Sequence, residues 1–385
     1  MKKFLALFLF LVLGFCSFFL TGCKKKSEEI VIGMSGPLTG GAAVYGVAVM
    51  QSAQLAVDEI NEAGGVNGYK LRLEALDDMH DASKVSINYA SLLEKGMQVG
   101  LGCVTTKPCL EFAKLSAQDK VFFLAPSATG DAVVEKDNAY QMCFADTRQG
   151  TFSARYVNEN VSKDTKIGIL YRSGDEYSEG IYNKFVEELD SGFTKVVASF
   201  NSDDTTDFAS QVELLKECKF IFLPIYYTPA SVFMTQAKTV IASDAVYFGC
   251  DGLDGIDSSI EGFDINTIPQ EVSYLSHFNS KATSGPAKEF IDKYVSKYEA
   301  STLNQFGASA YDCVYALAAA LKKIAEKNPE AVTPNAKPAD LCKLLQEEFN
   351  GGFTFSGVTG TNVTWTKEGF VDKAAVKYVV KESSK

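Results

Sequence analysis

The feature that most constrains the fold is an alternation of short apolar strands with longer amphipathic helices, which begins after residue 28. Residues 30–34 form an apolar run, and apolar side chains then recur every three or four positions as far as Ala63, the spacing of a helix. Residues 69–75 alternate apolar and charged side chains, as a strand with one solvated face does. The series continues with a helix after Asp81 or Ser83 and with apolar strands at 97–103 and 121–125, around another helix. Strands that alternate with helices predict a doubly wound, parallel α/β sheet.

The same alternation starts again in the second half of the chain. Its expected strands are 166–171, 195–200, 220–223 and 246–248, and its expected helices are 179–189, 208–216 and 230–241. Helical patterns return at 286–298, 308–327 and 339–349, before short strands and turns at 353–380. Because a chain of 385 residues usually makes two domains, the two series predict two α/β lobes.

The first 23 residues are typical of an exported protein. A basic start, Met1-Lys2-Lys3, precedes an apolar run from Phe4 to Leu20, and Thr21-Gly22-Cys23 closes it. These are the parts of a secretory signal, and the run is slightly short for a bilayer span. An uncleaved membrane helix, or a soluble secretion signal with a chance cysteine, is the alternative. No other segment is long and apolar enough to cross a membrane.

The chain is acidic, with 37 basic and 48 acidic residues and a net charge of −11. Removal of residues 1–22 takes away Lys2 and Lys3 and changes the net charge to −13. This balance argues against a nucleic-acid partner and against docking on anionic lipid. The only basic run, Lys24 to Lys26, lies in a short solvated tether at 23–27.

Cysteine and histidine usage gives no metal site. Seven cysteines remain beyond Cys23, namely Cys103, Cys109, Cys143, Cys218, Cys250, Cys313 and Cys342. An odd number leaves at least one unpaired, and Cys103 with Cys109 or Cys143 is the candidate disulfide. No CxxC spacing occurs, and His80 and His277 are the only histidines. We therefore expect no metal and no cofactor.

Several motifs match a known family in order. The most specific is Glu59-Ile60-Asn61-Glu62-Ala63-Gly64-Gly65-Val66-Asn67-Gly68, which follows Gly36-Pro37-Leu38-Thr39-Gly40. Further matching segments are Asp77-Asp78, 125–129, 143–146 with Gln149-Gly150, 177–180, 227–229, 249–252 and Tyr311-Asp312. Together they resemble the leucine/isoleucine/valine-binding family of periplasmic solute-binding proteins of ABC importers. Leu20-Thr21-Gly22-Cys23 resembles the lipobox of bacterial lipoproteins, which implies cleavage before Cys23 and a lipid on that residue.

The resemblance implies the type I periplasmic-binding-protein fold, in which two doubly wound α/β lobes are joined by three crossover segments and close on a ligand. Lobe one would comprise residues 28–146 plus 276–356, and lobe two residues 147–275 plus 357–385. The resemblance to a lipobox implies that the protein lies outside the cytoplasm, anchored by lipid on the periplasmic side or at the cell surface.

Hydroxyl side chains just past two expected strands are candidates to bind a ligand carboxylate. Thr105-Thr106 follows the strand at 97–103, and Ser127 and Thr129 follow the strand at 121–125. Backbone N–H groups where a strand turns into a helix bind anions, and hydroxyls add donors. The alternative is that these residues only cap the next helix.

The ligand's ammonium group needs a carboxylate in a dry cleft. Asp251 follows the strand at 246–248, at the end where α/β sheets bind ligands, and its position resembles the family's ammonium-binding carboxylate. The alternative is a turn aspartate in Asp-Gly. Three departures bear on the ligand: some members have glutamate in place of Asp251, serine is usual at Thr106, and some have a disulfide cysteine at His80. Tyr45, Tyr177, Tyr227 and Phe306 match the family's aromatic wall.

The sequence therefore predicts a monomeric binding protein that captures an amino acid, branched-chain or similarly hydrophobic, and delivers it to an ABC transporter permease. The alternatives are the ligand-binding component of a sensor, and a binding protein for an amide or another small polar solute. An enzyme is not expected, because Gly33-Met34-Ser35-Gly36 lacks the GxSxG spacing and Gly100-Leu101-Gly102 lacks the third glycine of a dinucleotide turn.

Overall fold

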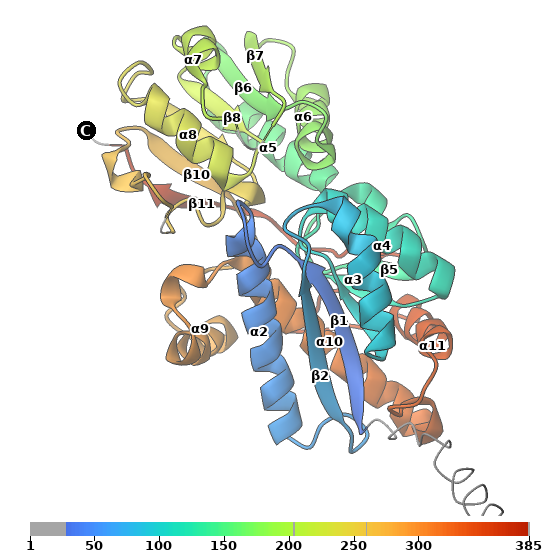
Figure 1. Ribbon diagram of the computed structural model, residues 1–385. Coiled ribbons are helices and arrows are strands. Elements are labelled where there is room, and N and C mark those ends of the chain that lie inside the picture. Colours follow the sequence, from blue (N-terminus) through green and yellow to red (C-terminus); the bar gives the residue numbers. More distant parts are fainter. Residues whose placement is uncertain (1–27, 203–204, 259, 384–385) are drawn as a thin grey trace, which may run out of the picture.

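The computed structural model describes residues 28–202, 205–258 and 260–383, and these form two α/β lobes (Figure 1). The expected signal at 1–22, the tether at 23–27 and the lipid on Cys23 lie outside the described residues. Within the described part of the chain, no helix is both long and apolar enough to cross a membrane.

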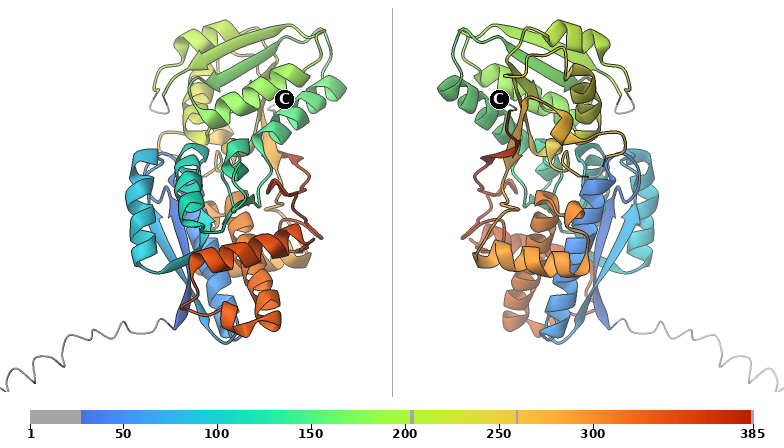
Figure 2. Two further views of the ribbon diagram at one scale, coloured as in Figure 1. Left: turned by 90° about the vertical axis from the view of Figure 1, so that its right-hand side faces the viewer. Right: turned by 90° about the vertical axis from the view of Figure 1, so that its left-hand side faces the viewer.

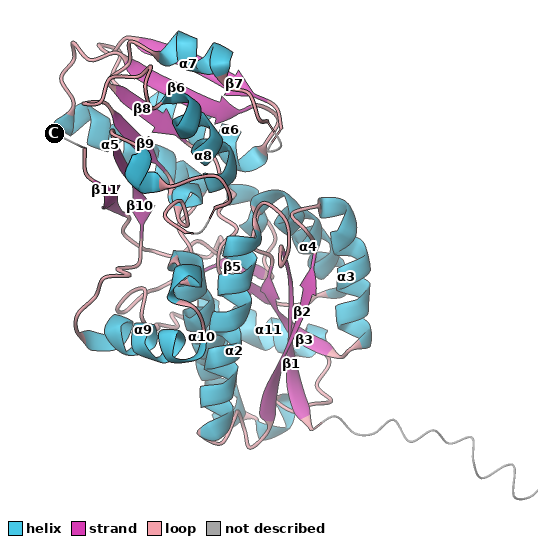
Figure 3. Ribbon diagram, turned by 60° about the vertical axis from the view of Figure 1, so that its left-hand side comes forward, coloured by secondary structure: helices cyan, strands magenta, loops and turns pink. Residues whose placement is uncertain are grey.

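The first lobe is built on a five-stranded parallel sheet with the order β2-β1-β3-β4-β5. The strands are β1 (Glu29–Gly36), β2 (Lys70–Asp77), β3 (Met97–Gly102), β4 (Phe123–Ala125) and β5 (Ala139–Gln141). One face packs on α2 (Ala43–Glu62), α10 (Gln305–Lys327) and α11 (Pro338–Asn350). The other face packs on α3 (Ala82–Glu94) and α4 (Thr106–Asp119), so helices cover both sides of the strands (Figure 3). Helix α9 (Gly285–Lys297) lies beside α2 and makes ion pairs to it.

The second lobe is built on a six-stranded sheet with the order β11-β10-β9-β8-β6-β7. The strands are β6 (Ile167–Arg172), β7 (Lys195–Phe200), β8 (Phe220–Leu223), β9 (Val246–Gly249), β10 (Glu271–Ser276) and β11 (Val376–Lys381). Only β11 pairs in the antiparallel sense, against β10. The helices are α5 (Asp146–Asn160), α6 (Glu176–Glu188), α7 (Ala209–Leu215) and α8 (Tyr227–Ala237). Short 3-10 turns are η1 (Asp131–Val134), η2 (Asp251–Leu253), η3 (Ile265–Thr267), η4 (Ala300–Thr302) and η5 (Pro329–Ala331).

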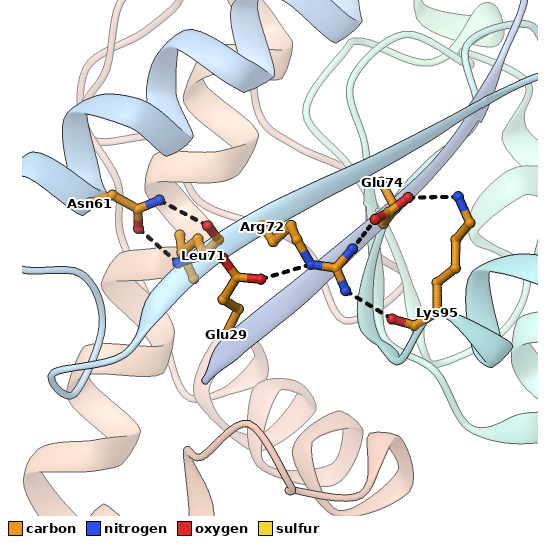
Figure 4. Close-up of polar contacts among 6 residues, drawn as sticks. All are labelled: Glu29, Asn61, Leu71, Arg72, Glu74 and Lys95. Carbon is orange, nitrogen blue, oxygen red and sulfur yellow. Dashed lines mark hydrogen bonds and ion pairs between the residues drawn. The ribbon is translucent and has the colours of Figure 1, made fainter. Parts of the chain in front are cut away.

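A network of hydrogen bonds and ion pairs links α2, β1, β2 and the turn before β3 in the first lobe (Figure 4). The Asn61 side chain at the end of α2 exchanges two hydrogen bonds with the Leu71 backbone, at 2.7 and 2.8 Å. Arg72 pairs with Glu29 at 2.9 Å and with Glu74, and donates to the Lys95 carbonyl at 3.0 Å. These contacts hold α2 and β2 to the turn before β3.

The chain crosses between the lobes three times: from β5 to α5, from β10 to α9, and from α11 to β11 (Figure 2). At these crossings the buried Lys373 donates to the Met142 carbonyl at 2.7 Å and to the Thr359 hydroxyl at 2.5 Å. The third crossing is therefore tied to the first. Two parallel-sheet lobes joined in this way confirm the predicted fold class.

The structure differs from the sequence expectations in three elements and in the cysteines. Strand β5, helix α5 and strand β10 lie in segments for which no element was predicted. The candidate disulfide is wrong for this structure, because all seven cysteines of the described chain are free and buried. As buried free thiols, they fill space in the core as small side chains.

Candidate ligand-binding site

A pocket of about 230 Å³, which is partly open to solvent, lies between the carboxyl ends of the strands of the two sheets. Strand order reverses beside β3 in the first sheet and beside β8 in the second, and such reversals are where α/β sheets bind ligands. The cavity is lined by Tyr45, Val104, Thr105, Thr106, Ser127, Thr129, Tyr177, Tyr226, Asp251, Gly252 and Phe306. Eight of the nine predicted ligand-binding residues are thus brought together, from both lobes.

The first lobe contributes neutral donors at the start of α4. Thr105 is the residue before the helix, yet its side chain makes no capping hydrogen bond. Its hydroxyl instead lies 2.8 Å from Nδ1 of His80. The Thr106 hydroxyl accepts from the Gly130 backbone N–H at 3.2 Å. Because the first N–H groups of a helix lack intrahelical partners, this end of α4 can accept an anion.

Ser127 and Thr129 follow β4 and complete the same half of the cavity. Both are buried and line it. The Asp146 backbone N–H donates to the Thr129 carbonyl at 2.9 Å, which holds this loop against the start of α5. Gly130 must be glycine here, since a Cβ would come within 2.4 Å of the Thr106 side chain.

The second lobe contributes a carboxylate. Asp251 follows β9, and its Oδ1 accepts from the Tyr177 hydroxyl at 2.8 Å. Its backbone N–H donates to Oε1 of Gln149 at 3.0 Å. The second oxygen, Oδ2, has no hydrogen-bond partner within the described part of the chain, although the side chain is buried. An unsatisfied buried carboxylate oxygen is costly, so this atom is suited to a cationic partner.

The charge around Asp251 is unbalanced. Burial raises the pKa of its carboxyl to about 7, against the opposing effect of the Tyr177 and Gln149 hydrogen bonds. Asp146, at the start of α5, is also buried, and burial together with Asp251 raises its pKa. Gln149 donates to the Asp146 carboxylate at 3.3 Å and accepts from the Asp251 backbone N–H, so its side chain links the two residues. No lysine or arginine of the described segments forms an ion pair with either.

Aromatic rings form the rest of the wall. The Tyr226 ring stacks on Tyr177, with centroids 4.7 Å apart, and Phe306 meets Tyr45 edge to face at 5.1 Å. Tyr45 also crosses the cleft, because its hydroxyl donates to the Gly252 carbonyl at 2.5 Å and accepts from the Tyr227 N–H at 3.2 Å. This wall offers apolar area with a few polar edges.

Tyr227 is placed differently from the sequence expectation. It is buried at the start of α8, with its ring against Tyr45 at 5.0 Å, but it does not line the cavity. Its neighbour Tyr226 does. Sequence reasoning also missed Gln149 and Val104. The adjacent residues Tyr226 and Tyr227 could be recognised in the sequence as candidates for the cavity wall. Which of the two lines the cavity depends on the direction of the backbone at the start of α8.

The two histidines are separate from each other, and neither forms a metal site. His80 touches Thr105 beside the cavity, whereas His277 lies at the second crossing, with Nε2 2.6 Å from the Ser309 hydroxyl. Across the described ranges, no group of three or more His, Cys, Asp or Glu side chains could hold a metal ion.

Comparison with known proteins agrees with the overall fold. A family model described as periplasmic binding protein matches residues 29–383. The Leu/Ile/Val-binding protein BraC3 of Rhizobium johnstonii is 29% identical over 80% of this chain and 83% of that protein. The crystal structure of the leucine binding protein LivK from Thermotoga maritima has a TM-score of 0.78 at 22% identity, covering 91% of this chain and 95% of that one. The substrate binding protein LivJ from Streptococcus pneumoniae, in complex with isoleucine, has a TM-score of 0.76 at 24% identity, covering 92% and 99%.

Proposed function

This chain belongs to the periplasmic binding protein family. It is a substrate-binding protein of the branched-chain amino acid type that serves ABC transporters, and from that premise we propose which ligand it binds. The resemblance seen in the sequence is confirmed, and members of this family bind solutes and are not enzymes. The family acts outside the cytoplasm. We propose that the ligand is a free amino acid with a branched-chain or similarly hydrophobic side chain, and that it passes to a permease.

The observation that carries the proposal is the unpartnered Oδ2 of Asp251, a residue that lines the same cavity as the hydroxyl residues and the start of α4. An α-amino acid supplies one ammonium and one carboxylate, and each must be paired in a dry site. The ammonium is proposed to bind Asp251, and the carboxylate to bind Thr105, Thr106, Ser127 and Thr129. The side chain is proposed to lie against Tyr45, Tyr177 and Phe306, with Tyr227 supporting Tyr45 from behind.

Identification of the bound solute tests this proposal. Mass spectrometry of small molecules released from purified protein, followed by thermal unfolding with a panel of amino acids, amides and aromatic acids, should single out hydrophobic amino acids. A true ligand stabilises by about 2.7 kcal/mol at 100 times its Kd. Stabilisation by amides alone would instead support the small-polar-solute alternative. Reconstituted uptake with a candidate permease separates an importer component from a sensor component.

The lobe boundaries are part of the same proposal. We propose that residues 28–146 with 276–356 move as one body and residues 147–275 with 357–385 as the other. Ligand binding can shift such a hinge only by favouring the closed form. Small-angle X-ray scattering of the monomer should show a smaller radius of gyration with saturating ligand, and an unchanged profile at proven saturation would contradict this.

Anchoring by lipid on Cys23 is proposed from Leu20-Thr21-Gly22-Cys23. Stable anchoring takes more than one acyl chain. Cys23→Ser should move the protein from the detergent phase to the aqueous phase in a two-phase partition. Wild-type protein that already partitions as a soluble protein would contradict the anchor.

A further inference from the structure

A loop with a left-handed backbone places a histidine against Thr105, one of the residues that line the cavity. Met79 and His80 both have left-handed backbones, with φ of +55° and +61°, which is unfavourable for residues other than glycine. The loop is held by two aspartates, since Asp77 accepts from the Met79 N–H at 2.9 Å and Asp78 from the His80 N–H at 3.0 Å. This backbone places Nδ1 of His80 at 2.8 Å from Oγ1 of Thr105.

The Thr105 hydroxyl has only one hydrogen, and His80 decides where that hydrogen points. Thr105 makes no capping bond, and the residue lines the cavity. If Nδ1 is bare, the hydroxyl donates to the histidine and turns only lone pairs toward a ligand. If Nδ1 carries a hydrogen, the histidine donates to the hydroxyl oxygen, and the hydroxyl hydrogen is available to an acceptor in the cavity.

We propose, on the premise of the amino-acid function above, that His80 is a positioning residue for the ligand carboxylate. Its Nδ1–H donates to Thr105 Oγ1, and this turns the Thr105 hydroxyl hydrogen toward the carboxylate. A carboxylate accepts hydrogen bonds and cannot donate them, so it selects this arrangement over the reverse one.

The histidine ring lies at the contact between the two lobes. His80 comes from the first lobe, and its ring meets Tyr226 of the second lobe edge to face at 5.4 Å. Tyr226 in turn stacks on Tyr177, which bonds Asp251. The Tyr226 ring of the second lobe, which also carries Asp251, thereby helps to hold the His80 ring that orients the Thr105 hydroxyl in the first lobe.

Three variants test the proposal by isothermal titration with L-leucine. His80→Gly keeps a left-handed backbone and removes the ring, and it should weaken binding about three- to tenfold, the loss of one hydrogen bond. His80→Asn should bind within about twofold of wild type, because its Nδ2 can occupy the place of Nδ1 and asparagine tolerates this backbone. Met79→Gly, the matched control at the neighbouring strained position, should bind like wild type. Binding by His80→Gly at the wild-type level, or failure of His80→Asn to restore it, would overturn the proposal.

A double-mutant cycle separates positioning from packing. In the Thr105→Val background, His80→Gly should cause no further loss of affinity, because the hydroxyl through which it acts is gone. Additive losses would show that His80 acts in another way.

Nitrogen NMR of the wild-type protein gives a readout that does not depend on the variants. The chain has only two histidines, so ¹⁵N-histidine labelling reports His80 with His277 as the internal reference. With L-leucine bound, Nδ1 of His80 should have the chemical shift of a protonated ring nitrogen; a bare Nδ1 in the complex would overturn the proposal. If wild-type protein binds no α-amino acid, the proposed function falls and this inference with it. If it binds L-leucine and only the His80 results fail, the function stands and this inference alone is wrong.

Discussion

Two buried aspartates, one at the lobe crossings and one in the cleft, differ in how their oxygens are satisfied. Both are 1% exposed. At the crossings, Oδ1 of Asp312 accepts from the Val358 N–H at 2.8 Å, and Oδ2 accepts from both the N–H and the hydroxyl of Thr359 at 2.8 and 2.5 Å. In the cleft, Oδ1 of Asp251 accepts from Tyr177, while Oδ2 has no partner within the described residues.

The neighbouring charges differ in the same way. Burial raises the pKa of both carboxyls, but at Asp312 the buried cation Lys373 opposes that rise most strongly. At Asp251 the opposing groups are only neutral donors, and Asp254 adds to the rise. The polar cluster at Asp312 is therefore complete within the chain, whereas the one at Asp251 is incomplete, at the position where we propose that the ammonium of a ligand binds.

The same substitution should lower ligand affinity at Asp251 and fold stability at Asp312, and the larger effect is expected at Asp251. Asp251→Asn keeps the shape and removes the charge. Leaving a ligand ammonium buried without its counter-charge costs about 3–5 kcal/mol, or roughly two to four decades in Kd. We expect at least a hundredfold weaker amino-acid binding by isothermal titration, without loss of stability in the ligand-free protein. Wild-type affinity in this variant would mean that another group holds the ammonium.

Asp312→Asn should instead lower the stability of the fold. The amide would place an NH₂ group against the donors of Val358 or Thr359 and would leave Lys373 without its nearby carboxylate. We expect a loss of about 3 kcal/mol in the free energy of unfolding, measured by urea denaturation. A urea midpoint equal to that of wild type would contradict the proposed difference, in which Asp312 stabilises the fold and Asp251 binds ligand.

pH should separate affinity from stability at Asp251. Because burial raises its pKa from 3.8 to about 7, the protonated form predominates below about pH 7 in the folded, ligand-free protein. The stability from this group is full below pH 3.8 and is lost as the pH rises through about 7. The ammonium needs the ionised form, so affinity should fall below about pH 7, approaching about tenfold per pH unit.

Titration calorimetry and urea denaturation between pH 5 and 8 measure these two trends. Asp251→Asn should flatten the stability trend, because it has no carboxyl to titrate at this position. A steep trend that persists in this variant would assign the titration to another carboxyl, such as Asp254, whose pKa burial also raises.

The smallest effect is expected from Tyr177→Phe. The Tyr177 hydroxyl donates to Asp251 and accepts from the Gly252 N–H at 2.8 Å, while its ring supplies the aromatic wall. Removing only the hydroxyl should weaken binding by about 1 kcal/mol, or roughly fivefold. A loss as large as that of Asp251→Asn would mean that the hydroxyl, and not the carboxylate, is the main determinant of affinity.

Most strands and helices could be predicted because their apolar residues follow a strand or helix period. Helix α5 could not, although its buried residues do recur at helical spacing. Those residues include Asp146, Gln149, Gly150 and Ser153, so the first half of its buried face is polar and apolar residues follow only at Ala154 and Val157. A helix that buries polar side chains beside a binding cavity is invisible to a hydrophobic pattern, because the groups that satisfy it come from other parts of the chain.

The sequence by itself determined the two α/β series, the positions of Thr105, Thr106, Ser127, Thr129 and Asp251 just past strands, and the family. These depend on local periodicity and on short motifs. Only the tertiary structure decided that Tyr226 and not Tyr227 lines the cavity, that His80 meets Thr105, and that Asp251 is unpaired while Asp312 is satisfied. Each of these is a contact between segments far apart in the chain, or the direction of one side chain at a helix start. Such contacts are set by how strands, helices and loops pack within each lobe and between the lobes, which no local pattern contains.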